Sequence, residues 1–451
     1  MGQSASSHSG SATSPTAALK WASEAEREVL LSLLRNASAS AANEGSPQAP
    51  SASVSSAISQ SIPERLRKAV AEFAVARSGT ATKGIVTMTG LATAARILLL
   101  GDASEKQTFV NTYAEVNPGV TTKGLVEDIA AGVGLFAKDG KAGADGKVYS
   151  PTERFVTYLL GSLAPKSDKS AADAIFSSED TPTRNAEIPP LSSFQQWFPQ
   201  SSLLQELWTN LFQFAFLGTL PTTLPALTST LLTIEDRFIL CTSLASEFKG
   251  AKSWPCLFST QTDGASWTVF AGKVQEQGSV LFVIRDKDQN VFGAFAAEEL
   301  VPRPKFVGDS RTFVFTLRPQ IGVFSPAGYN ANYQYYNTGA ATFPNGIGFG
   351  GQLDYFGLYI SSTFENGHSK ASPRSSTFDS PRLSAKEEFQ IDFVEAFLVK
   401  PKEVDDRLID PKLAKKSILN DDVASSLLEM SGKRMYSKEV QQDRVEEDEE
   451  T

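Results

Sequence analysis

The chain has 451 residues, of which 41% are hydrophobic, and its formal charge is −9 at pH 7. This length favours two or three domains, and the acidic balance argues against a nucleic-acid-binding surface over the whole chain. Cys241 and Cys256 are the only cysteines, which excludes a disulfide framework and favours a reducing compartment. No apolar run approaches the about 18 residues of a membrane span, and the start lacks the apolar core of a secretory signal.

The first residues match a lipid-attachment pattern. Met1, Gly2 and Ser6 fit M-G-x-x-x-[ST], the N-myristoylation signal, which would place an acyl chain on Gly2. The alternative is an unmodified Ser/Ala-rich start. One myristoyl chain binds membranes only marginally, and no nearby Cys or Lys/Arg cluster offers a second anchor. Stable membrane residence would therefore require a membrane-bound partner protein.

Two stretches near the start, residues 1–18 and 36–61, are rich in Ser, Ala, Pro and Gly and predict disorder. Between them, residues 21–34 combine helically spaced apolar residues with acidic ones, which predicts an amphipathic helix. This helix either docks on the region that follows or lies on a surface, and docking is favoured.

Residues 62–220 show helical periodicity, which predicts a helical domain. The expected helices cover 63–77, 84–101, 104–115, 121–137, 151–163, 168–178 and 201–217. The loop from Asp139 to Glu153 superficially resembles a calcium loop. It has Gly143 at the fifth position and Ser150 at the twelfth, where calcium loops carry a ligand and a bidentate Glu, so no calcium site is expected.

The pattern changes to short β-type runs over residues 224–400. A helix is predicted at 235–248, and strands are predicted at 255–260, 266–272, 279–284, 291–297, 312–317 and 354–360. The runs at 267–270 and 280–284 are almost continuously apolar, as in strands buried on both faces, and 286–290 supplies a hairpin turn. The predicted fold class is α+β, with an antiparallel two-sheet core and peripheral helices behind an all-α region.

Four glycines, Gly346, Gly348, Gly350 and Gly351, fall within six residues. Read literally, Gly346-x-Gly348-x-x-Gly351 matches a dinucleotide fingerprint, but a strand rather than a helix follows, and no GK[ST] completes a P-loop. The favoured interpretation is a buried bend or bulge, and the alternative is a backbone that contacts a ligand.

No catalytic constellation is evident. His8 and His368 are the only histidines, and His368 has no neighbouring Cys or His to complete a nucleophile pair or metal set. The candidate carboxylates are Asp354, Glu365, Asp392 and Glu395. Asp392 and Glu395 are three apart, so a strand would place them on opposite faces, which does not support a glycosidase-like pair. Cys256 is expected to be a buried small hydrophobe.

The last residues, 402–451, carry nine Lys or Arg against fourteen Asp or Glu. A short helix is predicted at 421–430, followed by an acidic run at 446–450. The extension is either a solvated tail or an arm whose helix binds a partner or packs back on the domain.

Several short motifs resemble the TLDc domain family over roughly residues 224–400. In order they are WPCLFSTQTDGASW, DSRTFVFTL, NANYQYYN, PNGIGFGGQ, FGLYI, GHS, STFDSPRLS and FQIDFVEAFLV. The layout, with an acylation pattern and a helical module before the domain, is similar to the myristoylated branch. That branch includes fungal proteins named for restriction of telomere capping and an animal MTOR-associated lysosomal protein. The VEAF sequence at 394–397 departs from the usual V-E-V-W type of ending.

The resemblance implies a degenerate EF-hand-like helical region and a non-enzymatic role without cofactors or metals. The expected function is binding of V1 subunits of the vacuolar-type proton ATPase at the vacuolar or lysosomal membrane, with regulation of V1–Vo assembly. Oxidative-stress protection and an influence on telomere capping are the alternatives, and direct nucleic-acid binding is not expected. The candidate structural or binding loop comprises Gly346, Gly348, Gly350, Gly351, His368 and Glu395.

Overall fold

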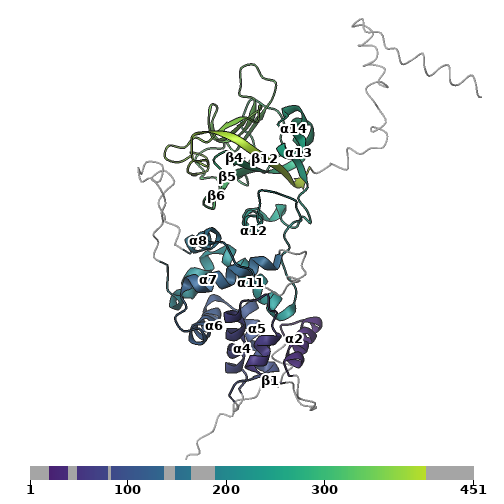
Figure 1. Ribbon diagram of the computed structural model, residues 1–451, viewed down its shortest axis with the longest axis vertical. Coiled ribbons are helices and arrows are strands. Elements are labelled where there is room, and N and C mark those ends of the chain that lie inside the picture. The colour runs from purple at the N-terminus through teal and green to yellow at the C-terminus, as the bar shows by residue number, and fades with distance from the viewer. Residues whose placement is uncertain (1–19, 39–47, 80–82, 137–147, 164–187, 403–451) are drawn as a thin grey trace, which may run out of the picture. The chain divides into compact units, whose positions relative to one another are not determined.

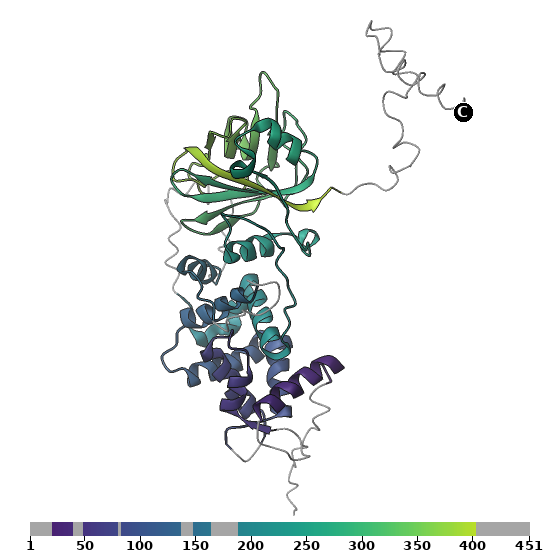
Figure 2. The same cartoon turned by 45° about the vertical axis from the view of Figure 1, so that its right-hand side comes forward.

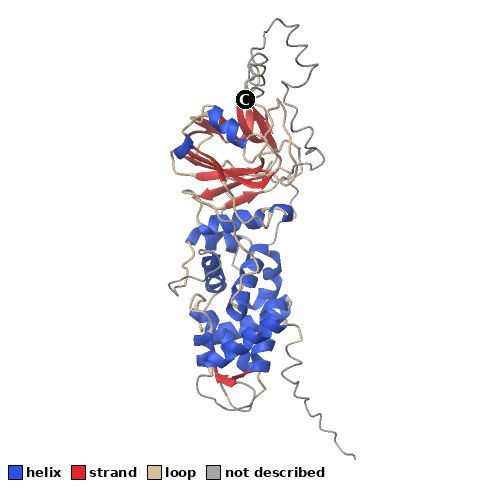
Figure 3. Cartoon of the chain, turned by 90° about the vertical axis from the view of Figure 1, so that its right-hand side faces the viewer, coloured by secondary structure: helices blue, strands red, loops and turns tan. Residues whose placement is uncertain are grey.

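The computed structural model describes residues 20–38, 48–79, 83–136, 148–163 and 188–402. The chain up to Pro401 forms one compact unit. Helices dominate its N-terminal part and strands its C-terminal part, which confirms the predicted α+β class (Figure 3). None of the helices in the described ranges has the length and apolar run needed to cross a bilayer. The helix predicted at 168–178, most of the loop from 139 to 153 and the helix at 421–430 lie outside the described residues.

The helices of the N-terminal part pack against one another (Figure 1), and their buried apolar residues belong to one core. Its longer helices are α2 (Glu24–Ala37), α3 (Ser51–Ala57), α4 (Glu64–Ala76), α5 (Met88–Leu100), α6 (Ala103–Val116), α7 (Thr122–Ala130), α8 (Glu153–Gly161) and α11 (Ser202–Leu217). Short helical turns η1 (Ala131–Phe136), η2 (Leu191–Ser193), α10 (Phe194–Trp197) and η3 (Phe198–Gln200) connect them. In the core, Phe109 meets Phe73, Trp208 and Phe212 edge-to-face at 5.3–5.7 Å between ring centroids. Such pairs add about 0.5–1.5 kcal/mol each beyond the burial of their area.

Two short strands give the first helices an EF-hand-like arrangement. β1 (Gln48–Pro50) pairs antiparallel with β2 (Ile85–Thr87), and each strand leads into a helix. Counting Val86 as the eighth loop position makes Gly84 the sixth, and Gly84 has a φ of 78°, as the sharp turn of an EF-hand loop requires. The first and twelfth positions are Gly79 and Gly90 rather than acids, so the loop lacks its main metal ligands.

A serine hydroxyl just before this loop links β2 to α4. Ser78 Oγ accepts a hydrogen bond from Thr87 N at 2.9 Å and donates one to Ala74 O at 2.8 Å. A Cβ at Gly90 would lie 2.1 Å from Ser78 Oγ, so the hydroxyl occupies the space where a twelfth-position side chain would begin. Ser78 therefore ties strand β2 to the end of α4.

Two predictions for the helical part need correction. The disorder predicted over 36–61 is wrong for its second half, because Val54 and Ile58 of this Ser-rich stretch are buried in the core. Apolar residues four apart are enough to anchor one short helix even where small polar residues surround them. The helix predicted at 84–101 begins only at Met88, because residues 85–87 pair with β1.

The C-terminal part is an antiparallel sandwich (Figure 2). Its strands are β3 (Cys256–Ser259), β4 (Gly278–Asp286), β5 (Val291–Ala296), β6 (Phe313–Arg318), β7 (Gly322–Phe324), β8 (Gln334–Asn337), β9 (Gly346–Gln352), β10 (Tyr355–Ser361), β11 (Asn366–His368) and β12 (Glu388–Pro401). The path runs β7-β6-β5-β4-β12-β11-β10-β9-β8, and β3 also pairs with β12. The long last strand is therefore shared by both layers, pairing with β11 near its start and with β3 further on.

Strand β4 is apolar throughout because it faces two cores. Phe282 and Ile284 pack between the two layers against residues of β9 and β10. Leu281 and Val283 point to the other side, where helix α12 (Ile234–Ser243) contributes Leu240. This double burial confirms the prediction made from the apolar run at 280–284.

The strand predicted at 266–272 is wrong, because α13 (Thr260–Asp263) and α14 (Trp267–Val274) follow β3. Ser266 caps α14 by accepting a hydrogen bond from Val269 N, which satisfies a free helix donor. Phe270 and Val274 are buried at helical spacing, whereas Val269 is 38% exposed. The helix predicted at 235–248 also ends early, at Ser243, and a turn, η4 (Ser246–Phe248), follows.

Candidate functional site

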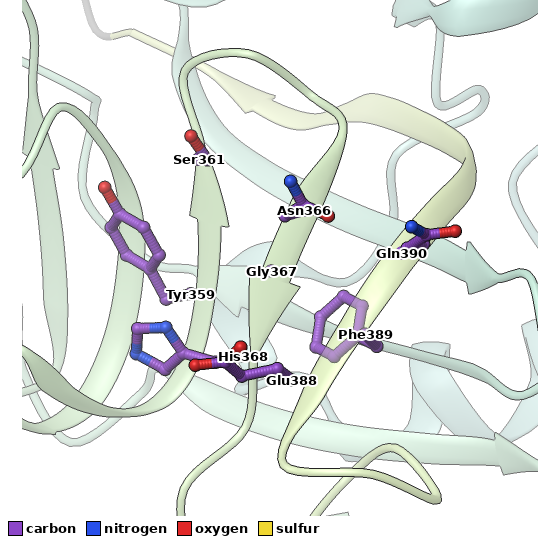
Figure 4. A pocket seen from close by; sticks show the side chains of 8 residues that line it. All are labelled: Tyr359, Ser361, Asn366, Gly367, His368, Glu388, Phe389 and Gln390. Atoms are coloured by element: carbon purple, nitrogen blue, oxygen red, sulfur yellow. The ribbon is translucent and has the colours of Figure 1, made fainter.

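A groove of about 450 Å³ lies on the outer face of β10, β11 and β12 (Figure 4). Its lining comprises Tyr359, Ser361, Asn366, Gly367, His368, Glu388, Phe389 and Gln390. The strand register explains this set, because His368 pairs with both Tyr359 and Glu388, and Asn366 pairs with Gln390. Directly paired residues in adjacent strands point to the same face, so two rows of polar side chains cross the sheet here.

His368 is held in the groove by aromatic stacking. Its ring lies 5.0 Å from that of Tyr359 at an interplanar angle of 24°, and 5.9 Å from that of Phe356. Burial lowers the pKa of His368 to about 4, and nearby Lys370 acts in the same direction. The imidazole is therefore neutral at pH 7. Its Nε2 is buried without a hydrogen-bond partner among the described residues.

The four predicted glycines lie on β9, next to this stack. A Cβ at Gly348 would lie 2.4 Å from the ring of Phe356, and one at Gly346 would lie 2.8 Å from Tyr359 Oη. Gly350 and Gly351 have φ values of 69° and 79°, a conformation that other residues rarely adopt. The glycines thus let aromatic rings lie close to the β9 backbone. Contact between that backbone and a ligand stays a prediction.

Glu395 lies away from the groove. It is seven positions beyond Glu388 on β12, which is roughly 23 Å along an extended strand. Glu395 is 3% exposed, and its carboxylate accepts hydrogen bonds from Ser229 Oγ at 2.5 Å and Thr230 N at 3.1 Å. The structure therefore brings His368 together with the glycines but not with Glu395, which fastens the 229–230 loop to the sheet.

The two cysteines differ from each other. Cys241 is buried, and burial raises the pKa of its thiol to about 11. Cys256 is exposed, so its predicted burial is wrong: it occupies the start of the edge strand β3, with one side open to solvent. Partial desolvation, and then Glu395, raise the pKa of the Cys256 thiol, so neither cysteine is activated as a thiolate. Over the described ranges, no group of three His, Cys, Asp or Glu could hold a metal.

The sequence did not point to Tyr359, Asn366, Glu388 or Gln390 as site residues. Tyr359 and Gln390 are about thirty positions apart in the sequence, and only the pairing of β11 with both β10 and β12 brings the four residues to one face. The sequence did carry a signal at the start of β12, because Glu388, Gln390 and Asp392 alternate with apolar residues, which is the pattern of a half-exposed strand.

Residues 226–400, which form this sandwich with its shared last strand and its glycine-rich β9, match the family model of the TLDc domain. Among curated proteins, the chain is similar to MTOR-associated protein MEAK7. The frog (Xenopus laevis) protein is 44% identical over 187 residues, 41% of this chain and 39% of the relative. The human protein (Homo sapiens) is 42% identical over 189 residues, 41% and 40% of the two chains.

A more distant relative is oxidation resistance protein 1 of Schizosaccharomyces pombe, 28% identical over 152 residues, which are 32% of this chain and 78% of the relative. The matches to the MEAK7 proteins thus span less than half of either partner. They identify a shared domain, and the activities of the whole relatives enter only as proposals.

Proposed function

We propose that this chain is a non-enzymatic binding protein of the vacuolar or lysosomal surface. In this proposal its TLDc domain binds V1 subunits of the vacuolar-type proton ATPase and regulates the association of V1 with Vo. An acyl chain on Gly2 adds weak membrane affinity and so raises the local concentration of the domain. The relatives named for association with MTOR favour a role in protein assemblies.

The observation that carries the proposal is the TLDc domain at residues 226–400. The chemistry of its surface also favours binding over catalysis, because a neutral, stacked His368 is a poor acid–base group at pH 7. Polar side chains in an open groove suit recognition of another molecule.

The test is affinity purification of the tagged chain from cells that express it, beside a chain that ends at Pro401 and a Gly2→Ala variant. Recovery of V1 subunits with the full chain supports the proposal, and their loss on truncation places a contact in residues 402–451. Gly2→Ala is expected to leave the protein in the cytosol while V1 binding in solution survives. Absence of V1 subunits from all three samples contradicts the proposal.

A second candidate is a redox-protective activity of the domain itself. The exposed thiol of Cys256 and the similarity to oxidation resistance protein 1 favour it. Replacing both Cys241 and Cys256 with Ser should then abolish the protection of cells against peroxide. Unchanged protection by the double variant eliminates a thiol mechanism.

A further inference from the structure

The groove beside His368 offers hydrogen-bond acceptors and a negative charge, and its lining contains no Lys or Arg. Glu388 and Asn366 are exposed on adjacent strands. Among the described residues, neither side chain has a hydrogen bond or ion pair, whereas Gln390 accepts one hydrogen bond from Lys287 Nζ at 3.1 Å. Acceptors without protein partners at a hollow are available to a ligand that brings donors.

The aromatic wall of the groove is fixed in place. The hydroxyl of Tyr359 donates to Asn345 O at 2.8 Å, and its ring stacks on His368. The lowered pKa of His368 keeps this wall uncharged at pH 7. Two lysines lie beside the groove: Lys287 donates a hydrogen bond to Gln390, and Lys370 lies 3.7 Å from a Glu387 carboxylate oxygen and 5.6 Å from the centre of the Tyr355 ring. Neither lysine belongs to the lining, and each already contacts a polar or acidic side chain, so Glu388 is the charged group that the lining presents at pH 7.

We propose that this groove binds an arginine side chain presented by a partner protein. A guanidinium is always charged and planar, and it carries five donors in a fork. That fork can donate to the Glu388 carboxylate and to the Asn366 amide oxygen. Its flat face can lie against the aromatic wall that Tyr359 forms. A lysine ammonium matches the charge but lacks the planar fork.

The groove fits a side chain better than an enclosed small molecule. Small-molecule sites bury most of their ligand, whereas three residues of this lining, Asn366, Glu388 and Gln390, are exposed. The formal charge of −9 also favours encounter with a basic surface. This inference goes beyond the proposed function, because it names a surface and the chemistry of its partner without depending on which protein carries the arginine.

The test is an NMR titration of the ¹⁵N-labelled full chain with the tripeptide Ac-Gly-Arg-Gly-NH₂. We expect concentration-dependent shifts of the Asn366 and Gln390 side-chain amides. The same peptide with citrulline, which keeps the shape but loses the charge, is expected to bind about tenfold more weakly, since hydrogen bonds between charged groups are the stronger ones. A lysine peptide is expected to fall between the two.

Two variants test whether the arginine peptide binds in the groove. Glu388→Gln is expected to weaken the arginine peptide about tenfold, because it removes the one carboxylate of the lining. Glu387→Gln removes the same charge one residue away, outside the lining, and is expected to change the affinity less than about twofold. Equal affinity for the citrulline peptide, equal losses in both variants, or shifts confined to other surfaces overturn the proposal. Because the probe is a peptide, these outcomes are independent of whether V1 subunits are recovered.

Discussion

Carboxylates occur in two contrasting settings in this chain. Where α8 meets α12, Glu235 and Asp236 are fully buried. Glu235 accepts hydrogen bonds from Thr152 N at 2.7 Å and Thr152 Oγ1 at 2.5 Å, and Asp236 pairs with Arg154 at 3.0 Å and Arg318 at 3.1 Å. On the outer face of β12, Glu388 is exposed and has no partner among the described residues.

This contrast in burial and pairing distinguishes carboxylates that hold the fold together from a carboxylate that is available for binding. Arg154 also donates to Leu317 O at 2.6 Å, so one side chain of the helical part contacts both α12 and β6 of the TLDc domain. Phe238 of the same α12 packs in the core of the helical part, while Leu240 packs against the sheet. The buried acids therefore hold two parts of the chain together, whereas Glu388 leaves its hydrogen-bonding capacity to solvent or a ligand.

The largest change in the free energy of unfolding is expected from Arg154→Met, which disrupts the buried ion pair between Arg154 and Asp236. The variant leaves Asp236 buried with a single cation, and removing one member of a buried ion pair costs about 3–5 kcal/mol of unfolding free energy. Urea denaturation measures this change. The control is Arg35→Met, whose exposed partner Glu28 lies 3.9 Å away, and where a change below about 1 kcal/mol is expected. Equal losses in the two variants would show that the ion pair is not structural.

Local sequence patterns predicted the strands that are buried on both faces, such as β4 and β5, because apolar runs identify them without knowledge of their neighbours. The same criterion failed at Trp267–Phe270, where a short apolar run belongs to a capped helix. The amino-acid composition wrongly predicted disorder at residues 51–57, where buried Val54 and Ile58 anchor a Ser/Ala helix. In each case tertiary packing outweighed the local signal.

Local sequence patterns could not predict the groove, because the order of the strands in the sheet brings its residues together. β12 follows β11 by about twenty residues yet inserts between β11 and β4 at the centre of the sheet path. That insertion places Glu388 beside His368. The motifs resembling the TLDc family supplied the domain limits and drew attention to His368, but only the register shows which side chains share its face.

A smaller effect is expected from filling the space beneath the aromatic stack with Gly348→Ala. The added methyl would lie 2.4 Å from Phe356, so the ring must move, at about 1–3 kcal/mol of unfolding free energy. Gly272→Ala is the matched control, because nothing lies within 4 Å of its Cβ position in α14. There the change should stabilise by about 0.5–1 kcal/mol. Thermal melts that move in the same direction for both variants would contradict this account of the glycines.

The smallest expected effect is on the pH dependence of the free energy of unfolding, to which the titration of His368 contributes. Its pKa is about 4 in the folded chain, below the ordinary 6.5, because burial and Lys370 disfavour the charged form, while Glu387 and Asp354 oppose them more weakly. The unfolded chain takes up the proton near pH 6.5, so the contribution of neutral His368 is complete above that pH and is lost as pH falls toward 4. His368→Phe keeps a ring in the stack but cannot titrate. We therefore expect urea denaturation at pH 7.5 and pH 5 to show a larger acid-induced loss for the native chain than for the variant, and equal losses would mean that the imidazole is protonated in the fold.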